Sequence, residues 1–336
     1  MVGQFWKISL CTLLVLLMTG CYFGSASKVN TGGSGDITVW LAYWDIDDGS
    51  KDIKRLKGTV YNISYFAAYF DKDDKLFIPE EITQKKEELE NLSGKAYLSF
   101  VNDKEKSDGT NILKDKDVLR RAFENDESMQ NHIDKILSLT KQGKYDGVEI
   151  DYEALWKDAD LTKKFLVFID KLYTQAEAAG LKVRIVLEPK TPFSAGFSKG
   201  PEYVVMMYNL YGLHSDPGPK ANREFIQSVL GKMQKLPGEK SVAFATGGCL
   251  WGSNGVKRLL TEDEAVALAK KQHAKLNRDK ESGCQVFSYE EDGITYTIWY
   301  ADAETIKYWR SAALEIGDTN ISLWRMGGNS DIGKIQ

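Results

Sequence analysis

Three carboxylates, on Glu149, Asp151 and Glu153, occupy every second position near the middle of the chain. The residues between them are apolar or aromatic, so the pattern predicts a strand with the acids on one face. Neighbouring acids would lie about 6–7 Å apart at Cα, and a partly buried site cannot keep all three ionised at low cost. A protonated carboxyl beside an ionised one is the pair that cleavage of a glycosidic bond requires.

A second interpretation of this segment is an edge strand with a solvated acidic face, which is common in antiparallel sheets. Apolar strand-like segments recur along the chain, however, and helical segments join them. That arrangement favours a parallel sheet in which the acidic strand is buried on both sides.

Strand-like and helix-like segments alternate from Ile37 to Met326. Eight strands alternating with helices predict an α/β fold, a (β/α)₈ TIM barrel, with a small hairpin of residues 285–289 and 295–299 inserted between strands seven and eight. The predicted strands cover residues 37–44, 59–70, 95–101, 144–153, 182–187, 203–208, 241–246 and 321–325, and the longest predicted helices cover 119–142 and 161–179. Functional residues of such barrels lie at the C-terminal ends of strands, where Glu153, Glu188, Tyr208, Asn209, Trp251 and Trp324 fall.

The N-terminus reads as an export signal over residues 1–20, because its apolar run from Ile8 to Met18 is too short to cross a bilayer. Met18-Thr-Gly-Cys21 resembles a bacterial lipobox, which implies that Cys21 is lipidated and holds the protein on the outer side of the cell membrane. Residues 21–36 then form a flexible tether, and 37–328 form the barrel. Plain secretion after cleavage nearby is the alternative.

The composition excludes several classes of partner and cofactor. With a net charge of −4, the chain has no basic excess for nucleic acid, and we expect a monomer. His132, His214 and His273 show no metal-ligand spacing, so they are expected at surface or loop positions, with neither metal nor cofactor. In an exported protein, Cys249 and Cys284 are either a disulfide or two reduced buried thiols, and the sequence leaves both open.

Several motifs resemble those of glycoside hydrolase family 18. Asp146-Gly-Val-Glu-Ile-Asp-Tyr-Glu153 is similar to the Asp-x-x-Asp-x-Asp-x-Glu signature of that family, Met206-Met-Tyr-Asn209 to its motif on strand six, and Leu323-Trp-Arg325 to its strand-eight tryptophan. Residues 216–219, 299–303 and 322–327 are similar to the bacterial spore-germination and cortex-lytic N-acetylglucosaminidases.

The resemblance implies retaining, substrate-assisted hydrolysis of β-linked N-acetylglucosamine glycans, either peptidoglycan or chitin-like. Glu153 would be the acid, and Asp151 would orient the acetamide of the substrate. Asp146 and Glu149 would share charge behind Asp151. The implied sugar-binding residues are Tyr43, Met206, Tyr208, Asn209 and Trp324.

The resemblance leaves alternatives. Strand three lacks the Ser-x-Gly-Gly typical of dedicated chitinases, and Asn209 stands where many members carry Asp. Trp324 and Tyr43 fit core packing as well as sugar contact. A catalytically weak or inactive glycan-binding surface lipoprotein on the same barrel is the competing function.

Overall fold

The computed structural model describes residues 37–56, 60–92, 94–315, 317 and 320–335. The predicted export signal, Cys21 and the tether lie outside these residues. Within the described part of the chain, no helix is both long and apolar enough to cross a membrane.

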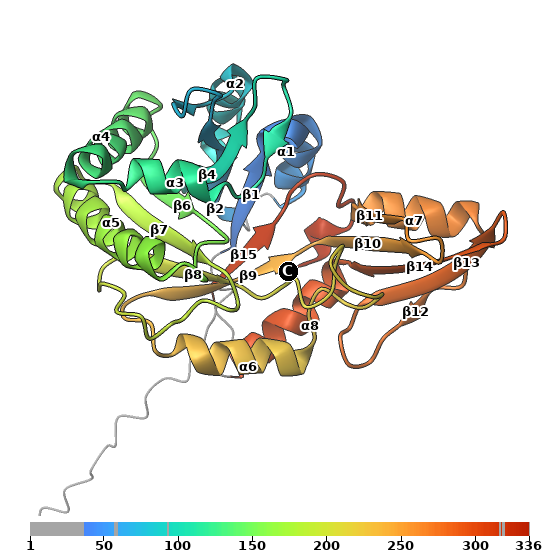
Figure 1. Cartoon of the computed structure of the whole chain (residues 1–336). Helices are drawn as coiled ribbons and strands as arrows, with labels where there is room; N and C mark the ends of the chain where they lie inside the picture. The colour runs from blue at the N-terminus through green and yellow to red at the C-terminus, as the bar shows by residue number, and fades with distance from the viewer. Residues whose placement is uncertain (1–36, 57–59, 93, 316, 318–319, 336) are drawn as a thin grey trace, which may run out of the picture. The chain divides into compact units, whose positions relative to one another are not determined.

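Eight parallel strands close into a barrel, as predicted (Figure 1). Neighbours in the ring follow chain order, and pairing of β1 with β15 and of β2 with β4 completes it. The barrel strands are β1 Ile37–Ala42, β2 Val60–Phe70, β4 Lys95–Glu105, β6 Gly147–Asp151, β7 Lys182–Leu187, β8 Glu202–Met206, β9 Lys240–Ala245 and β15 Ile321–Trp324. Two short strands, β3 Leu76–Phe77 and β5 Asn111–Ile112, pair antiparallel with the ends of β2 and β4.

Helices follow most of the barrel strands. They are α1 Ile46–Arg55, α2 Glu80–Leu89, α3 Lys116–Ala122, α4 Asp126–Gln142, α5 Ala159–Ala178, α6 Arg223–Met233 and α8 Ala303–Leu314. The single helix predicted over 119–142 is two, because Asn125 begins α4 with a capping box to Ser128. Residues 188–201, which join β7 to β8, contain no helix; Pro189 and Pro192 disfavour one there.

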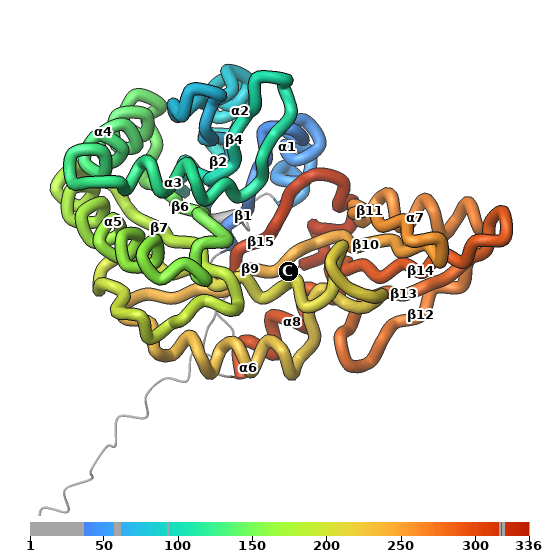
Figure 2. The backbone as a smooth tube through the Cα atoms, viewed as in Figure 1, coloured from blue at the N-terminus to red at the C-terminus, as the bar shows by residue number. Residues whose placement is uncertain are grey.

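The insertion between β9 and β15 is larger than the predicted hairpin. That hairpin exists as β13 Gln285–Glu291 and β14 Ile294–Ala301, and it belongs to a five-stranded antiparallel sheet. The other members are β10 Gly247–Gly252, β11 Lys257–Leu260 and β12 Asn277–Arg278, with α7 Glu262–Lys271 packed on one face. Figure 2 follows the backbone out of β9 into this sheet and back through α8 to β15.

Side chains inside the barrel form two chemically distinct layers. Near the C-terminal ends of the strands they are mostly apolar, including Trp40, Phe66 and Met206. Nearer the N-terminal ends they are polar and buried: Thr38, Ser64, Ser99, Glu149, Arg184, Ser241 and Ser322. A barrel interior is more often filled with branched apolar side chains, so the polar layer needs its own explanation.

Candidate active site

A cavity of about 630 Å³ opens at the C-terminal end of the barrel. Seven residues that the sequence singled out for catalysis or sugar binding line it: Tyr43, Asp151, Glu153, Met206, Tyr208, Asn209 and Trp324. They come from the ends of β6, β8 and β15, from the residues just after β6 and β8, and from the turn after β1, which parallel strands bring to one edge. The structure therefore gathers into one cavity residues that are up to 281 positions apart in the sequence.

Asp151 is the buried acid of this cavity, with 8% of its surface exposed. Its Oδ1 has no hydrogen-bond partner among the described residues. Burial raises the pKa of Asp151 well above its usual range, and the nearby charges of Glu153 and Glu149 raise it further. A buried carboxyl oxygen without a partner is costly, so it is suited to meet a polar group of a ligand.

Glu153 lies at the mouth, where its carboxylate meets Lys114 Nζ at 2.6 Å. Burial raises the pKa of Glu153, and Lys114 opposes that increase by favouring the ionised form. No sequence pattern indicated Lys114, which reaches the site from the segment between β5 and α3.

The backbone around Glu153 is held on both sides. Asn102 accepts a hydrogen bond from the Glu153 N–H at 2.9 Å and donates one to its carbonyl oxygen at 3.2 Å. Glu188, considered in the sequence as a functional residue, accepts a bond from the Ala154 N–H at 3.1 Å and does not line the cavity. Glu188 is thus a positioning residue for the turn after β6.

Tyr208 is buried beside the two acids. Burial raises the pKa of its hydroxyl well above the usual range, and the charges of Asp151 and Glu153 add to this effect. The hydroxyl therefore keeps its proton and remains a hydrogen-bond donor toward the cavity.

Glu149 lies one layer deeper, fully buried, and forms an ion pair with Arg184 at 2.9 Å. It also accepts hydrogen bonds from Trp40, Ser64 and Ser99. Its link to Asp151 is the effect of its charge on the pKa of Asp151, and no hydrogen bond joins the two carboxylates. Arg184 had no functional signal in the sequence.

The prediction that Asp146 shares charge behind Asp151 is wrong. Asp146 is exposed at the N-terminal end of the strand, where it accepts a hydrogen bond from the Ala96 N–H at 2.8 Å. The reason is strand geometry, because Asp146 lies three positions before Glu149 and an odd spacing places side chains on opposite faces.

Trp324 both packs and lines the cavity. Its ring lies 4.7 Å from Phe66 and 6.0 Å from Trp40, measured between centroids, while Trp44 beside it is 50% exposed. Tyr43 belongs to a 3₁₀ turn after β1, not to the strand, and stacks on Tyr69 at 5.2 Å. These rings form an apolar wall of the kind on which a sugar face can stack.

The inserted sheet borders the same cavity through Cys249 and Leu259. Trp251 of β10 does not line the cavity. Its indole N–H donates to the carbonyl oxygens of Gly212 and Ser215, at 3.2 and 3.0 Å, and so holds the loop after β8. That loop supplies Tyr211, Leu213, His214 and Lys220 to the lining.

The structure corrects two further interpretations of the sequence. Cys249 and Cys284 are free buried thiols, so the disulfide interpretation is wrong. His132 is not at the surface but buried, bonded to the Tyr152 hydroxyl at 2.8 Å, and burial lowers its pKa to about 4. No group of three or more His, Cys, Asp or Glu in the described chain could hold a metal ion.

Comparison with known proteins gives similar folds and one similar sequence. No family model matches the chain. The uncharacterized glycosylase YvbX of Bacillus subtilis is 24% identical over 235 residues, which cover 65% of this chain and 67% of YvbX. A chitinase from Chromobacterium violaceum has a TM-score of 0.77 at 16% identity, covering 90% of this chain and 99% of the chitinase. The spore cortex-lytic enzyme SleL of Bacillus cereus has a TM-score of 0.77 at 17% identity, covering 90% and 74%.

Proposed function

We propose that the chain is a member of glycoside hydrolase family 18 and hydrolyses β-linked N-acetylglucosamine glycans by a retaining, substrate-assisted mechanism. The observation that carries this proposal is the buried Oδ1 of Asp151, which has no hydrogen-bond partner in the described part of the chain and lies in one cavity with Glu153 and Tyr208. The similar sequence of a glycosylase and the similar folds of a chitinase and a cortex-lytic enzyme support it.

Each acid would have one task in this reaction. Glu153 protonates the glycosidic oxygen while the 2-acetamido oxygen of the substrate attacks the anomeric carbon, and the bond to the leaving oxygen breaks. Asp151 accepts a hydrogen bond from the acetamide N–H and stabilises the positive oxazolinium ring. Tyr208 donates a hydrogen bond to the acetamide oxygen. Water then attacks the anomeric carbon as the bond from that carbon to the acetamide oxygen breaks and the oxazolinium ring opens, and the water gives a proton to the Glu153 carboxylate.

Lys114 has to move for the first step. While its ammonium lies 2.6 Å from Glu153, it stabilises the ionised carboxylate, the form that cannot act as an acid. The Lys114 side chain is 44% exposed, so it can turn toward solvent when a sugar enters. Burial by the sugar would then favour the protonated form of Glu153.

The test of the acid is Glu153→Gln, with the exposed Glu290→Gln on β13 as the matched control. We expect the first variant to lose hydrolysis of chitin oligomers and of purified peptidoglycan while it still binds them, because the amide keeps the shape and lacks the transferable proton. Product release is followed by mass spectrometry. If the parent binds both glycans and releases nothing, the competing function of an inactive glycan-binding protein is correct.

The mechanism is tested with substrates in which the group at carbon two of the sugar is changed. A substrate with a free amine or a hydroxyl there should not be cut, and the first product formed should keep the β anomer by NMR. A thiazoline analogue of the oxazolinium should inhibit. An inverted product, or a sugar trapped covalently on Glu188, contradicts assistance by the substrate.

The proposal includes an anchor at Cys21, which would hold the protein on the outer face of the cell membrane. Two or more acyl chains give stable attachment where a single chain does not. Cys21→Ser should release the protein from washed membranes or leave it unprocessed. A variant that stays with membranes and keeps the N-terminal mass of the parent rejects the anchor.

A further inference from the structure

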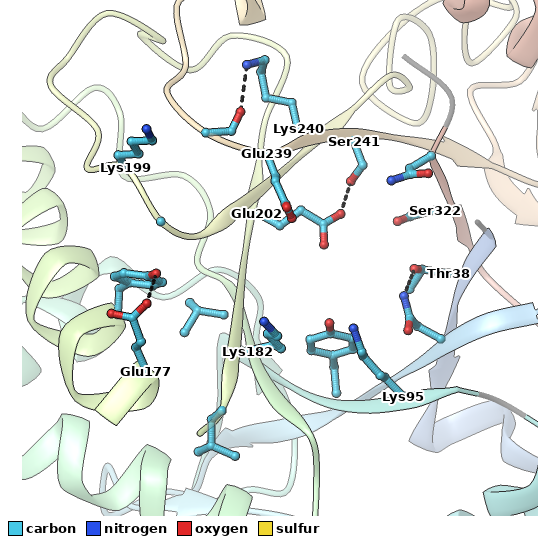
Figure 3. A pocket seen from close by; sticks show the side chains of 18 of the residues that line it. Thr38, Lys95, Glu177, Lys182, Lys199, Glu202, Glu239, Lys240, Ser241 and Ser322 are labelled. Carbon is cyan, nitrogen blue, oxygen red and sulfur yellow. Dashed lines mark hydrogen bonds between the residues drawn. The ribbon is translucent and has the colours of Figure 1, made fainter. Parts of the chain in front are cut away.

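A second cavity, of about 830 Å³, opens at the opposite end of the barrel, around the N-terminal ends of the strands (Figure 3). None of its lining residues lines the active-site cavity. It leads to the polar interior layer, and its deepest lining residues include Thr38, Asn62, Ser241 and Ser322, each at most 6% exposed. The cavity therefore exposes polar groups that a barrel normally covers with apolar side chains.

The deep end of this cavity offers unfilled hydrogen-bonding groups. Asn62 donates from Nδ2 to Thr38 Oγ1 at 3.0 Å, but its Oδ1 has no partner among the described residues. Thr38 and Ser322 accept bonds from Arg184, at 2.9 and 2.8 Å, and neither hydroxyl donates to a described residue. This end thus presents one amide acceptor and two hydroxyl donors, the complement of a peptide group.

Charges of both signs are interspersed around the rim, where Lys240 directly follows Glu239 in the chain. Lys95 and Lys182 stand at the starts of β4 and β7, and Glu202 and Glu239 stand beside the starts of β8 and β9 (Figure 3). Strands β7 and β8 are paired, so Lys182 and Glu202 lie on neighbouring strands. The polar deep end formed by Thr38, Asn62 and Ser322 lies beside Lys95, the register partner of Asn62, and across the ring of strands from Lys182 and Glu202.

Several of these charged groups have no partner in the described structure. Lys182 and Lys199 make no ion pair or side-chain hydrogen bond, and neither does Glu239. Glu202 accepts a bond from Ser241 at 2.6 Å and lies 3.5 Å from Arg184, which leaves further acceptor positions on its oxygens. Unpaired charges of both signs around one cavity match a ligand that also carries both signs.

We propose that this cavity binds a short peptide with a free amino and a free carboxyl end. The carboxylate lies against Lys182, the ammonium against Glu202 and Glu239, and the peptide groups between them meet Asn62 Oδ1 and the two hydroxyls. A volume of 830 Å³ is within the range of small-molecule sites and admits two or three residues. The site is independent of the glycan chemistry proposed above.

The experiment is calorimetric titration of the full-length protein with trialanine, N-acetyl-trialanine and trialanine amide. Trialanine should bind saturably, and each cap should weaken binding about tenfold, because each removes one charged hydrogen-bonding partner. Lys182→Ala should weaken binding of trialanine about tenfold and leave binding of the amide unchanged, since the amide has no carboxylate for Lys182 to meet.

The control variant is Lys270→Ala, an exposed lysine of α7 in the inserted sheet region, which should bind all three peptides as the parent does. Asn62→Leu tests the deep end and should weaken all three peptides alike. Because Lys182 is exposed at the rim, its substitution leaves folding intact and the result interpretable. The proposal is overturned if trialanine shows no saturable binding up to about 10 mM, if the caps have no effect, or if Lys182→Ala behaves as Lys270→Ala does.

Discussion

Replacing Arg184 with Met should destabilise the barrel more than any surface substitution. Arg184 is 1% exposed and donates to Glu149, Thr38 and Ser322, and Glu149 is fully buried. Removing the guanidinium leaves the Glu149 carboxylate inside the barrel without its counter-charge. Breaking one partner of a buried ion pair costs about 3–5 kcal/mol, and the near-complete burial of both side chains gives no reason to reduce that figure.

The measurement is the free energy of unfolding from urea titration, followed by tryptophan fluorescence. Arg223→Ala is the control, because Arg223 and Glu315 form an ion pair that is 40% and 45% exposed and should contribute at most about 1 kcal/mol. The double variant Arg184→Met, Glu149→Gln keeps an acceptor oxygen for Trp40 and the serines while removing the charge. The double variant should lose less free energy of unfolding, about 1–2 kcal/mol. If Arg184→Met costs no more than Arg223→Ala, the reasoning from burial is refuted.

Three further predictions concern the site and the cysteines. Lys114→Met should raise the pKa of Glu153. Because Glu153 must be protonated to act, the alkaline limb of the kcat/KM profile should move to higher pH. The ion pair is partly exposed and contributes about 1 kcal/mol, so kcat/KM on that limb, relative to its maximum, should rise roughly fivefold. An unmoved limb would mean that Lys114 does not control the acid. Tyr208→Phe should lower kcat about 10²-fold with little change in KM, since the lost hydrogen bond strengthens in the transition state; equal loss in both constants would contradict this. Dithiothreitol should leave the free energy of unfolding unchanged because Cys249 and Cys284 are free, whereas loss of a disulfide would cost about 2–5 kcal/mol.

The barrel and the acidic row could be predicted because both follow from simple periodicity. Alternation of Glu149, Asp151 and Glu153 with apolar residues specifies which side faces inward, and parallel strands bring their C-terminal ends to one edge. The prediction for Asp146 was wrong because all acids of the motif were assigned to the same face of the strand. The odd spacing of Asp146 from the other three turns its side chain outward.

The inserted sheet could not be predicted in full because β10 reads Gly-Gly-Cys-Leu-Trp-Gly, a composition that is weak for strands. The glycine is required by close packing, since a Cβ at Gly248 would lie 1.8 Å from the carbonyl oxygen of Trp299. Lys114 and Asn102 were missed for a different reason. They contact Glu153 across 39 and 51 residues, and no local pattern records such contacts.

The unpartnered oxygen of Asp151 has a consequence for the stability of the whole protein. Because burial raises the pKa of Asp151 in the folded state, the folded protein binds a proton more tightly at this group than the unfolded chain does. The contribution of Asp151 to stability is therefore greatest at low pH and decreases as the pH rises above 3.8, the ordinary value for the group. Near neutral pH, Asp151 therefore destabilises the folded state. Selection for stability alone would replace such an acid, so its presence indicates a trade-off between the stability of the fold and the activity of the site.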